Sequence, residues 1–433
     1  MTSRRQTYPL VVAFMLCVAA AFAQSTPIAD PTSVGMSAER LARIDPVLSR
    51  AVEDGDIVGV VAMVARHGSV VYLRAEGLAD REAERPMELS TRFRMASMTK
   101  PITSVAVMML FEEGAFLLTD PVSDYLPEFS NPYVLNSVEE DGAETHTLVP
   151  AERPITIHHL LTHTSGIAYP IFSGGVIGDL YDNAGLWDGL GIIDSTIEEG
   201  VRRIASVPLN HHPGDQFTYG LSIDVLGRLI EVVSGMSFAD FLRVRMFEPL
   251  GMDDTAFHVD GDQAASFATP YEENDDGDMA LLDSDPARST WARYPFEGPG
   301  TYFSGGAGLS STVHDYGRFC QALLNGGELD GARILSPRTV AFMTTNHIRD
   351  LPFGGESGAR FGLGFHLAGP QSSTHGIASE GTYGWGGYYG TTFSIDPAED
   401  MFLIVLTQTQ SAGAGRFNGG LFPNLVYQAI VAD

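Results

Sequence analysis

Apolar residues follow strand patterns near the two ends of the chain and mainly helical patterns between them. Residues 57–66 and 69–74 are rich in valine and other apolar residues, and His67-Gly68 between them favours a tight turn. These features predict an antiparallel hairpin near the N-terminus. Strand patterns return toward the C-terminus in the segments 361–368, 377–385, 391–396 and 401–408, the last two separated by a turn at 396–400. We therefore expect one sheet that takes strands from both ends of the chain.

Apolar residues spaced three and four positions apart predict helices over much of the remaining sequence. The predicted helices cover residues 37–52, 102–113, 156–161, 197–205, 222–234, 238–247, 312–324 and 421–431. Residues 169–194 are rich in glycine and aromatic residues, so we expect them to form a lid over a cleft. Residues 253–299 are acidic and irregular, which predicts a solvated excursion. The fold class indicated is α/β, more narrowly α+β: a mixed antiparallel sheet flanked by helices, formed by both termini, with an inserted α-helical region.

The first 23 residues have the features of a secretory signal peptide. Arg4 and Arg5 precede an apolar run at residues 10–22, and Ala21-Phe22-Ala23 forms a small-x-small cleavage site. This apolar run is too short for a membrane span, and no later run is long enough either. We expect an exported protein, periplasmic or secreted, without membrane insertion after signal removal.

The remainder, residues 24–433, is predicted to be a single domain. Its sheet parts are expected at about residues 30–115 and 305–433, and the helical insertion at about residues 116–304. After signal removal Cys320 is the only cysteine, so no disulfide can form within the chain. Stability must therefore come from a hydrophobic core, which a chain of this length can bury.

The charge of the chain narrows the range of partners. The sequence has 54 acidic and 26 basic residues, which gives a formal net charge of −28 at pH 7. Such a surface repels nucleic acid and anionic lipid. We expect neither as a partner, and the sequence leaves the oligomeric state open.

A serine and a lysine three positions apart stand in residues 93–101, at the start of a predicted helix. On a helix, Ser97 and Lys100 point to one face and come within reach of each other. A lysine that its surroundings keep neutral can take the serine proton and so create a nucleophile. Lys100 is the only lysine in the chain, beside 25 arginines, which cannot give up their proton. We interpret both residues as catalytic; the alternative is a surface lysine without a chemical role.

Two further stretches carry candidate chemistry. Tyr219 lies directly before the predicted helix 222–234, where its hydroxyl can reach a serine in a cleft and share in proton transfer beside a lysine. The alternative is a core or loop tyrosine. Residues 383–390, Tyr-Gly-Trp-Gly-Gly-Tyr-Tyr-Gly, contain glycines that permit close approach to the backbone. A substrate along that edge can meet N–H groups that stabilise an oxyanion; the alternative is a β-bulge or a tight hairpin.

Other catalytic motifs are absent or incomplete. His159 and His163 have the i, i+4 spacing of some zinc-binding helices, but no glutamate lies between them and no third ligand is suitably spaced. We interpret both histidines as structural. The chain has no Gly-x-Ser-x-Gly sequence, which excludes the nucleophile elbow of α/β-hydrolases. It also lacks the P-loop and dinucleotide-binding fingerprints.

Taken in order, these motifs resemble those of the serine β-lactamase-like and penicillin-binding-protein-like superfamily, especially class C β-lactamases and family VIII carboxylesterases. Ser97-Met98-Thr99-Lys100 matches the first motif, and Tyr219 matches the tyrosine of the second. Trp385-Gly386-Gly387 takes the place of the Lys-Thr-Gly motif, a replacement typical of the esterases. Residues 160–166, 224–227 and 305–309 are also similar to stretches of the superfamily.

The resemblance implies an acyl-enzyme on Ser97, with Lys100 and Tyr219 as base and proton shuttle. It implies an oxyanion hole formed by the backbone N–H groups of Ser97 and Tyr388, with residues 385–387 beside the substrate. No metal ion or organic cofactor is implied, and the expected partner is a small-molecule ester substrate.

Two departures from the superfamily pattern change the expected substrate. Leu221 stands where the second motif has an asparagine amide, and Trp385 stands where the third motif has a lysine cation. Because both missing groups bind β-lactam or peptide substrates, the sequence favours a carboxylesterase for short-chain acyl or aryl esters. The alternatives are a class C-like β-lactamase, a D-alanyl-D-alanine carboxypeptidase or D-aminopeptidase, and a non-catalytic homologue that binds cell-wall peptides. Arg349 or Arg360 folding into the cleft would restore a cation.

Overall fold

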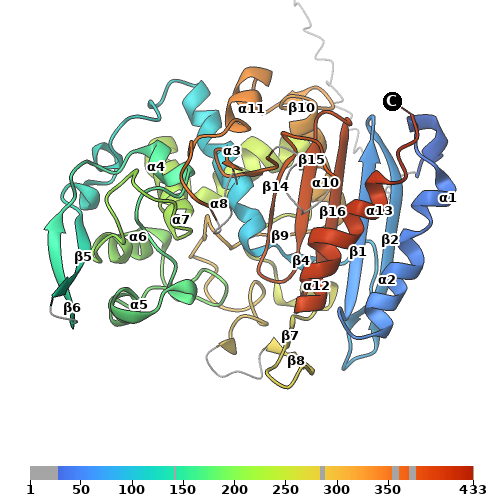
Figure 1. Ribbon diagram of the computed structural model, residues 1–433, viewed down its shortest axis with the longest axis horizontal. Coiled ribbons are helices and arrows are strands. Elements are labelled where there is room, and N and C mark those ends of the chain that lie inside the picture. Colours follow the sequence, from blue (N-terminus) through green and yellow to red (C-terminus); the bar gives the residue numbers. More distant parts are fainter. Residues whose placement is uncertain (1–27, 141–142, 283–287, 354–359, 370–376, 433) are drawn as a thin grey trace, which may run out of the picture.

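The computed structural model of the chain describes residues 28–140, 143–282, 288–353, 360–369 and 377–432 (Figure 1). The expected signal peptide, residues 1–23, lies outside the described residues. Within them, no helix combines the length and the apolar character needed to cross a lipid bilayer.

Eight strands form one sheet in which both ends of the chain meet (Figure 1). The neighbouring strands run antiparallel, and β1 lies beside β16 with Val60 opposite Thr407 and Arg66 opposite Met401. The order across the sheet is β12 (Arg360–Phe361), β13 (His366–Leu367), β14 (Tyr383–Gly386), β15 (Thr392–Asp396), β16 (Met401–Thr407), β1 (Gly59–Arg66), β2 (Ser69–Asp80) and β3 (Arg85–Pro86). The predicted fold class, an antiparallel sheet from both termini flanked by helices, is confirmed.

Helices cover both faces of this sheet because its central strands are apolar on both faces. All residues of β1 and β16 are buried. Successive β1 side chains alternate between two cores, so that Val60 packs on one face and Val61 on the other. The first face is covered by α1 (Ala38–Leu41), α2 (Ile44–Glu53), α12 (Ala412–Arg416) and α13 (Phe422–Tyr427) (Figure 1). On the second face, α10 (Val313–Leu324) contributes to the larger core.

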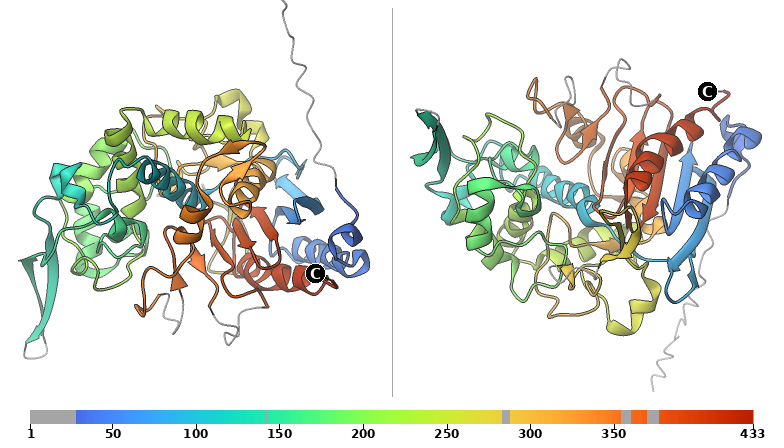
Figure 2. Two further views of the ribbon diagram at one scale, coloured as in Figure 1. Left: turned by 90° about the horizontal axis from the view of Figure 1, so that it is seen from above. Right: turned by 60° about the horizontal axis from the view of Figure 1, so that its bottom comes forward.

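Helix α3 (Thr99–Glu112) runs between the sheet and the helical region of the chain (Figure 2). Every residue from Thr99 to Leu110 is buried, which means that other elements surround the helix on all sides. Helix α7 (Ser222–Ser234) packs directly against it. The other helices are α4 (Ile157–Leu161), α5 (Gly175–Asn183), α6 (Ile197–Ala205), α8 (Phe238–Leu242), α9 (Glu248–Leu250) and α11 (Pro337–Met343).

Short strands form smaller sheets outside the main one. The pairs are β4 (Phe93–Arg94) with β9 (Ser310–Ser311), β5 (Tyr133–Glu140) with β6 (Ala143–Pro150), and β10 (Glu328–Leu329) with β11 (Ala332–Arg333). A three-stranded sheet joins β17 (Thr409–Gln410), β7 (Tyr271–Glu273) and β8 (Met279–Leu281). Strand β4 directly precedes the serine motif, so its pairing with β9 fixes the backbone that leads to Ser97.

Several predicted elements differ in the structure. The helix predicted at 37–52 is divided into α1 and α2, the strand predicted at 377–385 is present only as β14 from Tyr383, and the helix predicted at 421–431 ends with α13 at Tyr427. The strand predicted at 361–368 is divided into β12 and β13, because the chain turns at Gly364, whose φ of 88° favours glycine. The helix predicted at 238–247 ends as α8, and a π-helical turn follows over Arg243–Phe247.

Two segments of the central region carry more order than their composition predicts. The acidic segment 253–299 contains β7 and β8 and buries Tyr271 and Trp291, so it is only partly a solvated excursion. The β5–β6 hairpin, which no pattern indicated, projects from the body of the molecule (Figure 2). Its base is held by backbone hydrogen bonds between β5 and Leu209.

Candidate active site

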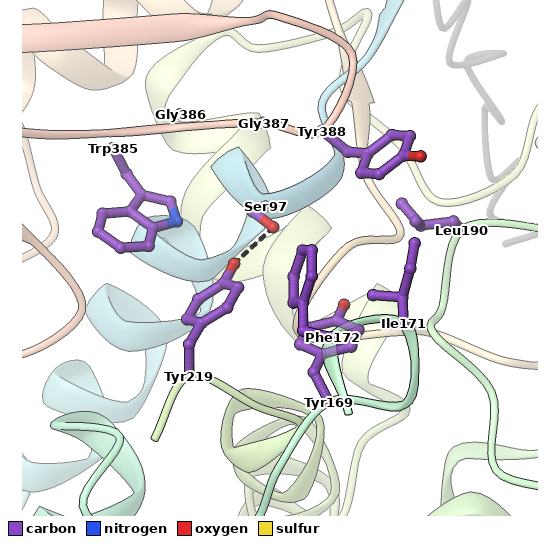
Figure 3. A pocket seen from close by; sticks show the side chains of 10 residues that line it. All are labelled: Ser97, Tyr169, Ile171, Phe172, Leu190, Tyr219, Trp385, Gly386, Gly387 and Tyr388. Atoms are coloured by element: carbon purple, nitrogen blue, oxygen red, sulfur yellow. Dashed lines mark hydrogen bonds between the residues drawn. The ribbon is translucent and has the colours of Figure 1, made fainter. Parts of the chain in front are cut away.

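Ser97 stands in the short 3-10 helix Ala96–Met98, which leads directly into α3. The preceding Ala96 has a φ of 45°, in the left-handed region that side chains other than glycine rarely adopt. Such a conformation costs on the order of 1–3 kcal/mol and persists only where the surroundings enforce it. Here Ala96 is completely buried in a small core with Leu190 and Tyr389. The strained turn presents the Ser97 hydroxyl to an open cleft (Figure 3).

Lys100 lies one helical turn beyond Ser97 and is almost completely buried. Its Nζ donates to Ser97 Oγ at 3.2 Å and to the carbonyl oxygen of Gly306 at 2.8 Å. The same Nζ lies 4.6 Å from the ring centre of Tyr219 and 5.1 Å from that of Tyr169. The alternative of a surface lysine is wrong, because the amine is enclosed and directed at the serine.

Tyr219 reaches the same serine from the loop before α7. Its hydroxyl donates to Ser97 Oγ at 2.6 Å (Figure 3). Its ring stacks on Tyr169 with centres 5.6 Å apart and packs against Trp385 at the same separation. The next residue must be a glycine, because a Cβ on Gly220 would lie 2.0 Å from the carbonyl oxygen of Ile167. The tyrosine ring is therefore held between aromatic neighbours with its hydroxyl on Ser97 Oγ.

His163 holds this tyrosine loop in place. Its Nδ1 accepts a hydrogen bond from the N–H of Gly220 at 3.3 Å, and its carbonyl oxygen accepts one from the N–H of Thr218 at 2.8 Å. The imidazole is completely buried against the Tyr219 ring. Burial, together with the charge of nearby Lys100, holds the pKa of His163 well below its usual range. The neutral ring can then keep accepting the Gly220 hydrogen bond.

His159, the other half of the histidine pair, closes the start of α4. Its Nδ1 accepts from the N–H of Thr156 at 3.2 Å, while the Thr156 side chain accepts from the N–H of His159. This reciprocal arrangement is a capping box. Across the part of the chain that the structure describes, His, Cys, Asp and Glu side chains form no group of three suited to a metal ion. His159 and His163 thus have structural partners, as their interpretation required.

Residues 386–388 lie beside Ser97 at the end of β14. A Cβ on Gly387 would lie 2.2 Å from Thr391 Oγ1 and 2.4 Å from the carbonyl oxygen of Met95, so only glycine fits there. This approach brings the Tyr388 backbone beside Ser97 (Figure 3). The N–H groups of Ser97 and Tyr388 are those that the resemblance implies as oxyanion donors, and both residues line the same cleft. The stretch is also the hairpin turn between β14 and β15, which the alternative interpretation of its glycines predicted, while the oxyanion interpretation stays a prediction.

The cleft beside Ser97 has mostly apolar and aromatic walls, opens to solvent and has a volume of about 290 Å³. Its wall at one end is Trp385, which packs against Phe361 with ring centres 5.4 Å apart. Arg360 is paired with Glu380 at 2.8 Å, and neither Arg360 nor Arg349 lines the cleft. The lining residues are Ser97, Tyr169, Ile171, Phe172, Leu190, Tyr219, Trp385, Gly386, Gly387 and Tyr388 (Figure 3). No cation is among these described lining residues.

The predicted lid, residues 169–194, supplies part of this wall. Tyr169, Ile171, Phe172 and Leu190 line the cleft, whereas Trp187 packs under Arg203 at 4.5 Å. All seven residues proposed from the sequence lie at or around one serine; only Lys100 is hidden behind the cleft surface. The individual lid residues were not predicted, because composition indicated the segment without indicating which side chains point inward.

A serine, a lysine and a tyrosine joined by hydrogen bonds at the seam of this sheet and helical region define a serine hydrolase of the β-lactamase and penicillin-binding-protein fold. The family model described as Beta-lactamase matches residues 44–420, and the chain belongs to that family.

Known relatives extend this assignment over nearly the whole chain. Esterase EstB of Burkholderia gladioli is 36% identical over 397 residues, which cover 89% of this chain and 94% of that protein. The structure of EstCE1, described as a hydrolase with promiscuous acyltransferase activity, superimposes with a TM-score of 0.73 at 30% identity, covering 91% of this chain and 99% of that one. Simvastatin synthase LovD of Aspergillus terreus shares the fold, with a TM-score of 0.73 at 23% identity, covering 90% of this chain and 98% of that one.

Proposed function

We propose that the protein is a carboxylesterase that hydrolyses short-chain acyl or aryl esters through an acyl-enzyme on Ser97. The observation that carries the proposal is the pair of hydrogen bonds from Lys100 and Tyr219 to one serine oxygen, at an apolar cleft. The similarity to two proteins described as an esterase and a hydrolase supports it.

In the first half of the reaction, Ser97 Oγ forms a bond to the ester carbonyl carbon, and the carbonyl electron pair moves onto its oxygen. The Oγ proton passes to Lys100, which acts as the base. The N–H groups of Ser97 and Tyr388 stabilise the negative oxygen. When the carbon–oxygen bond to the alcohol breaks, Tyr219 gives its proton to the departing oxygen and regains one from Lys100.

In the second half, a water molecule attacks the acyl group. Its proton passes to Lys100 through Tyr219, and the Ser97–acyl bond breaks as Oγ takes that proton back. The cycle releases one alcohol and one acid and restores every side chain. It draws only on water and the chain's own groups.

The preference for neutral esters follows from the cleft wall. Carboxylate substrates of this superfamily need a cation, and Trp385 offers a flat apolar face with one neutral donor instead. A hydrogen bond to a charged group contributes about 1.5–3 kcal/mol, so its loss weakens carboxylate substrates by roughly 10- to 150-fold. Phe172 and Leu190 enclose the space beside Ser97, which suits short acyl or aryl groups better than long chains.

The test compares kcat/KM for nitrophenyl butyrate, a chromogenic cephalosporin and a D-alanyl peptide in one buffer, with Ser97→Ala as the control. We expect the butyrate to be turned over most efficiently and the control to be inactive. Equal or higher efficiency on the cephalosporin or the peptide would put the β-lactamase or peptidase alternative first. Mass spectrometry after fluorophosphonate treatment should locate the adduct on Ser97, and an unlabelled serine would favour a non-catalytic homologue.

A further inference from the structure

A buried carboxylate lies behind the catalytic lysine, on a side of the site that faces away from the cleft. Asp224 belongs to the first turn of α7 and is completely buried. The helix that carries it begins just after Leu221, which replaces the asparagine of the superfamily's second motif. Leu221 is apolar and cannot accept a hydrogen bond, whereas Asp224, one helical turn later, brings two acceptor oxygens to the same end of α7.

The two carboxylate oxygens of Asp224 have different surroundings. Oδ1 accepts a hydrogen bond of 2.6 Å from the Ser304 hydroxyl. Oδ2 is buried and makes no hydrogen bond of ordinary geometry, although the backbone N–H of Gly306 helps to stabilise the carboxylate charge. A buried carboxylate oxygen with so little hydrogen bonding is costly, so a nearby positive charge would stabilise it strongly.

Gly306 places this oxygen next to Lys100. A Cβ built on Gly306 would lie 2.5 Å from Asp224 Oδ2 and 3.4 Å from Lys100 Nζ. The carbonyl oxygen of the same glycine accepts the 2.8 Å hydrogen bond from Lys100. The amine and the carboxylate therefore lie beside the same glycine, which has no side chain to separate them, although no direct ion pair joins the two groups.

Lys100 is the one cation that faces Asp224 among the described residues. Burial raises the pKa of Asp224, while the hydrogen bond from Ser304, the charge of Lys100 and the backbone N–H of Gly306 oppose that rise. Burial also holds the pKa of Tyr302 and Tyr169 well above their usual range, so both phenols stay neutral. The other titratable groups around this pair are Asp188, whose pKa burial raises to about 6, and His163 and Tyr219, which face Lys100.

We propose that Asp224 is a positioning residue for Lys100: held by Ser304, its carboxylate fixes the amine against Ser97 and compensates the positive charge that forms when the amine takes the serine proton. In this role Asp224 orients the base Lys100, as the third residue of a catalytic triad orients the base that activates the nucleophile. The inference rests on the proposed function, because it requires Lys100 to act as the base.

The test is the variant Asp224→Asn, which keeps the shape of the side chain and removes its charge. Without the negative charge the amine holds a proton less tightly, so the acid limb of the kcat/KM profile should move to lower pH by about one unit. The weaker base should also lower kcat by roughly 10- to 100-fold, with KM within about threefold. The rate at which a fluorophosphonate labels Ser97, measured over the same pH series, should change in parallel without depending on the choice of ester.

Asp396→Asn is the matched control. Asp396 is also completely buried and accepts hydrogen bonds from Tyr427 and Ser379, but it lies on β15 within the sheet. This variant should lose thermal stability and leave the pH profile in place. An equal shift of the kcat/KM pH profile in both variants would overturn the proposal. So would an Asp224→Asn variant whose pH profile matches that of the wild type. A loss of kcat in Asp224→Asn without a shift of the acid limb would also overturn it.

Ser304→Ala decides the question if Asp224→Asn does not fold. It removes the hydrogen bond that holds the carboxylate, so kcat should fall with little change in KM, and an unchanged kcat would overturn the proposal. Labelling of the wild-type protein tests the proposed function separately from the role of Asp224. If the fluorophosphonate does not label Ser97 in the wild-type protein, the acyl-enzyme is wrong and this inference falls with it.

Discussion

The Tyr219 hydroxyl lies 2.6 Å from Ser97 Oγ, although 122 positions separate the two residues in the chain. Ser97 follows β4 in the 3-10 helix that leads into α3, and Tyr219 lies in the loop before α7 of the helical region. The activated serine therefore forms only where these two parts of the chain pack together. Whatever loosens the packing of α7 on α3 should remove activity before it unfolds the sheet.

Tyr219→Phe should lower kcat by roughly 10²- to 10⁴-fold and change KM little, because a proton shuttle acts in the transition state. The phenylalanine ring still stacks between Tyr169 and Trp385, so binding of the substrate should survive. Steady-state kinetics with nitrophenyl butyrate measure both constants. Tyr72→Phe, which removes a hydroxyl bonded to Asp45 on the far side of the sheet, is the control. A loss below threefold would reduce Tyr219 to a packing residue.

Lys100→Arg should be nearly inactive even though it keeps the positive charge. A guanidinium cannot release its proton at ordinary pH, and its planar head is larger than the buried amine that it replaces. The measurement is kcat together with the rate of Ser97 labelling by a fluorophosphonate. Because the chain has no other lysine, loss of amine-selective labelling from the α3 peptide confirms the substitution directly. Retention of most of kcat would show that Lys100 is needed only for its charge.

The contacts that could be predicted are those set by local geometry or by a motif. Ser97 and Lys100 are three residues apart, so a helix alone brings them together. The β1–β2 hairpin was predicted because His67 and Gly68 suit a turn, and both have positive φ, 50° and 72°. Tyr219 could be placed at the serine only through the resemblance to a superfamily, since no local rule spans that separation.

The features that could not be predicted depend on side chains from distant segments. The proposed role of Asp224 depends on Gly306, which lies in another segment and places no side chain between the carboxylate and Lys100. Ile171 and Phe172 line the cleft because the turn Pro170–Phe172 points them inward, and a glycine-rich composition does not encode that direction. The hydrophobic periodicity of a sequence describes one helix or strand at a time, whereas each of these contacts depends on several separate segments of the chain.

Gly387→Ala should lower kcat by roughly 10²- to 10³-fold, the loss typical of removing one oxyanion donor. The added Cβ would collide with the carbonyl oxygen of Met95 and with Thr391 Oγ1, and relief of the clash must displace the Tyr388 N–H from Ser97. Gly386→Ala is a matched control, because a Cβ there meets only the carbonyl oxygen of Thr391 at 3.3 Å. Kinetics on one ester should show a far smaller loss for the control. Equal losses in both variants would argue against an oxyanion role for this turn.

The last prediction concerns acid stability. Burial lowers the pKa of His158 from 6.5 to about 4, and it holds the pKa of His163 well below 6.5. Unfolded histidines take up protons below their ordinary value of 6.5, whereas these two stay neutral in the folded protein until the pH is much lower. The unfolded state therefore binds more protons in this window, so stability is complete above pH 6.5 and is lost as the pH falls toward 4.

Each such histidine contributes a slope of about 1.4 kcal/mol per pH unit within the window. Urea denaturation at several pH values above and below 6.5 measures the slope. His163→Asn should reduce it by the share of one histidine, because the asparagine carbonyl can still accept from the Gly220 N–H without taking up a proton. His67→Asn, in the exposed β1–β2 turn, keeps the positive φ that asparagine tolerates and should leave the slope unchanged. If both variants keep the wild-type slope, carboxylates rather than His163 control unfolding by acid.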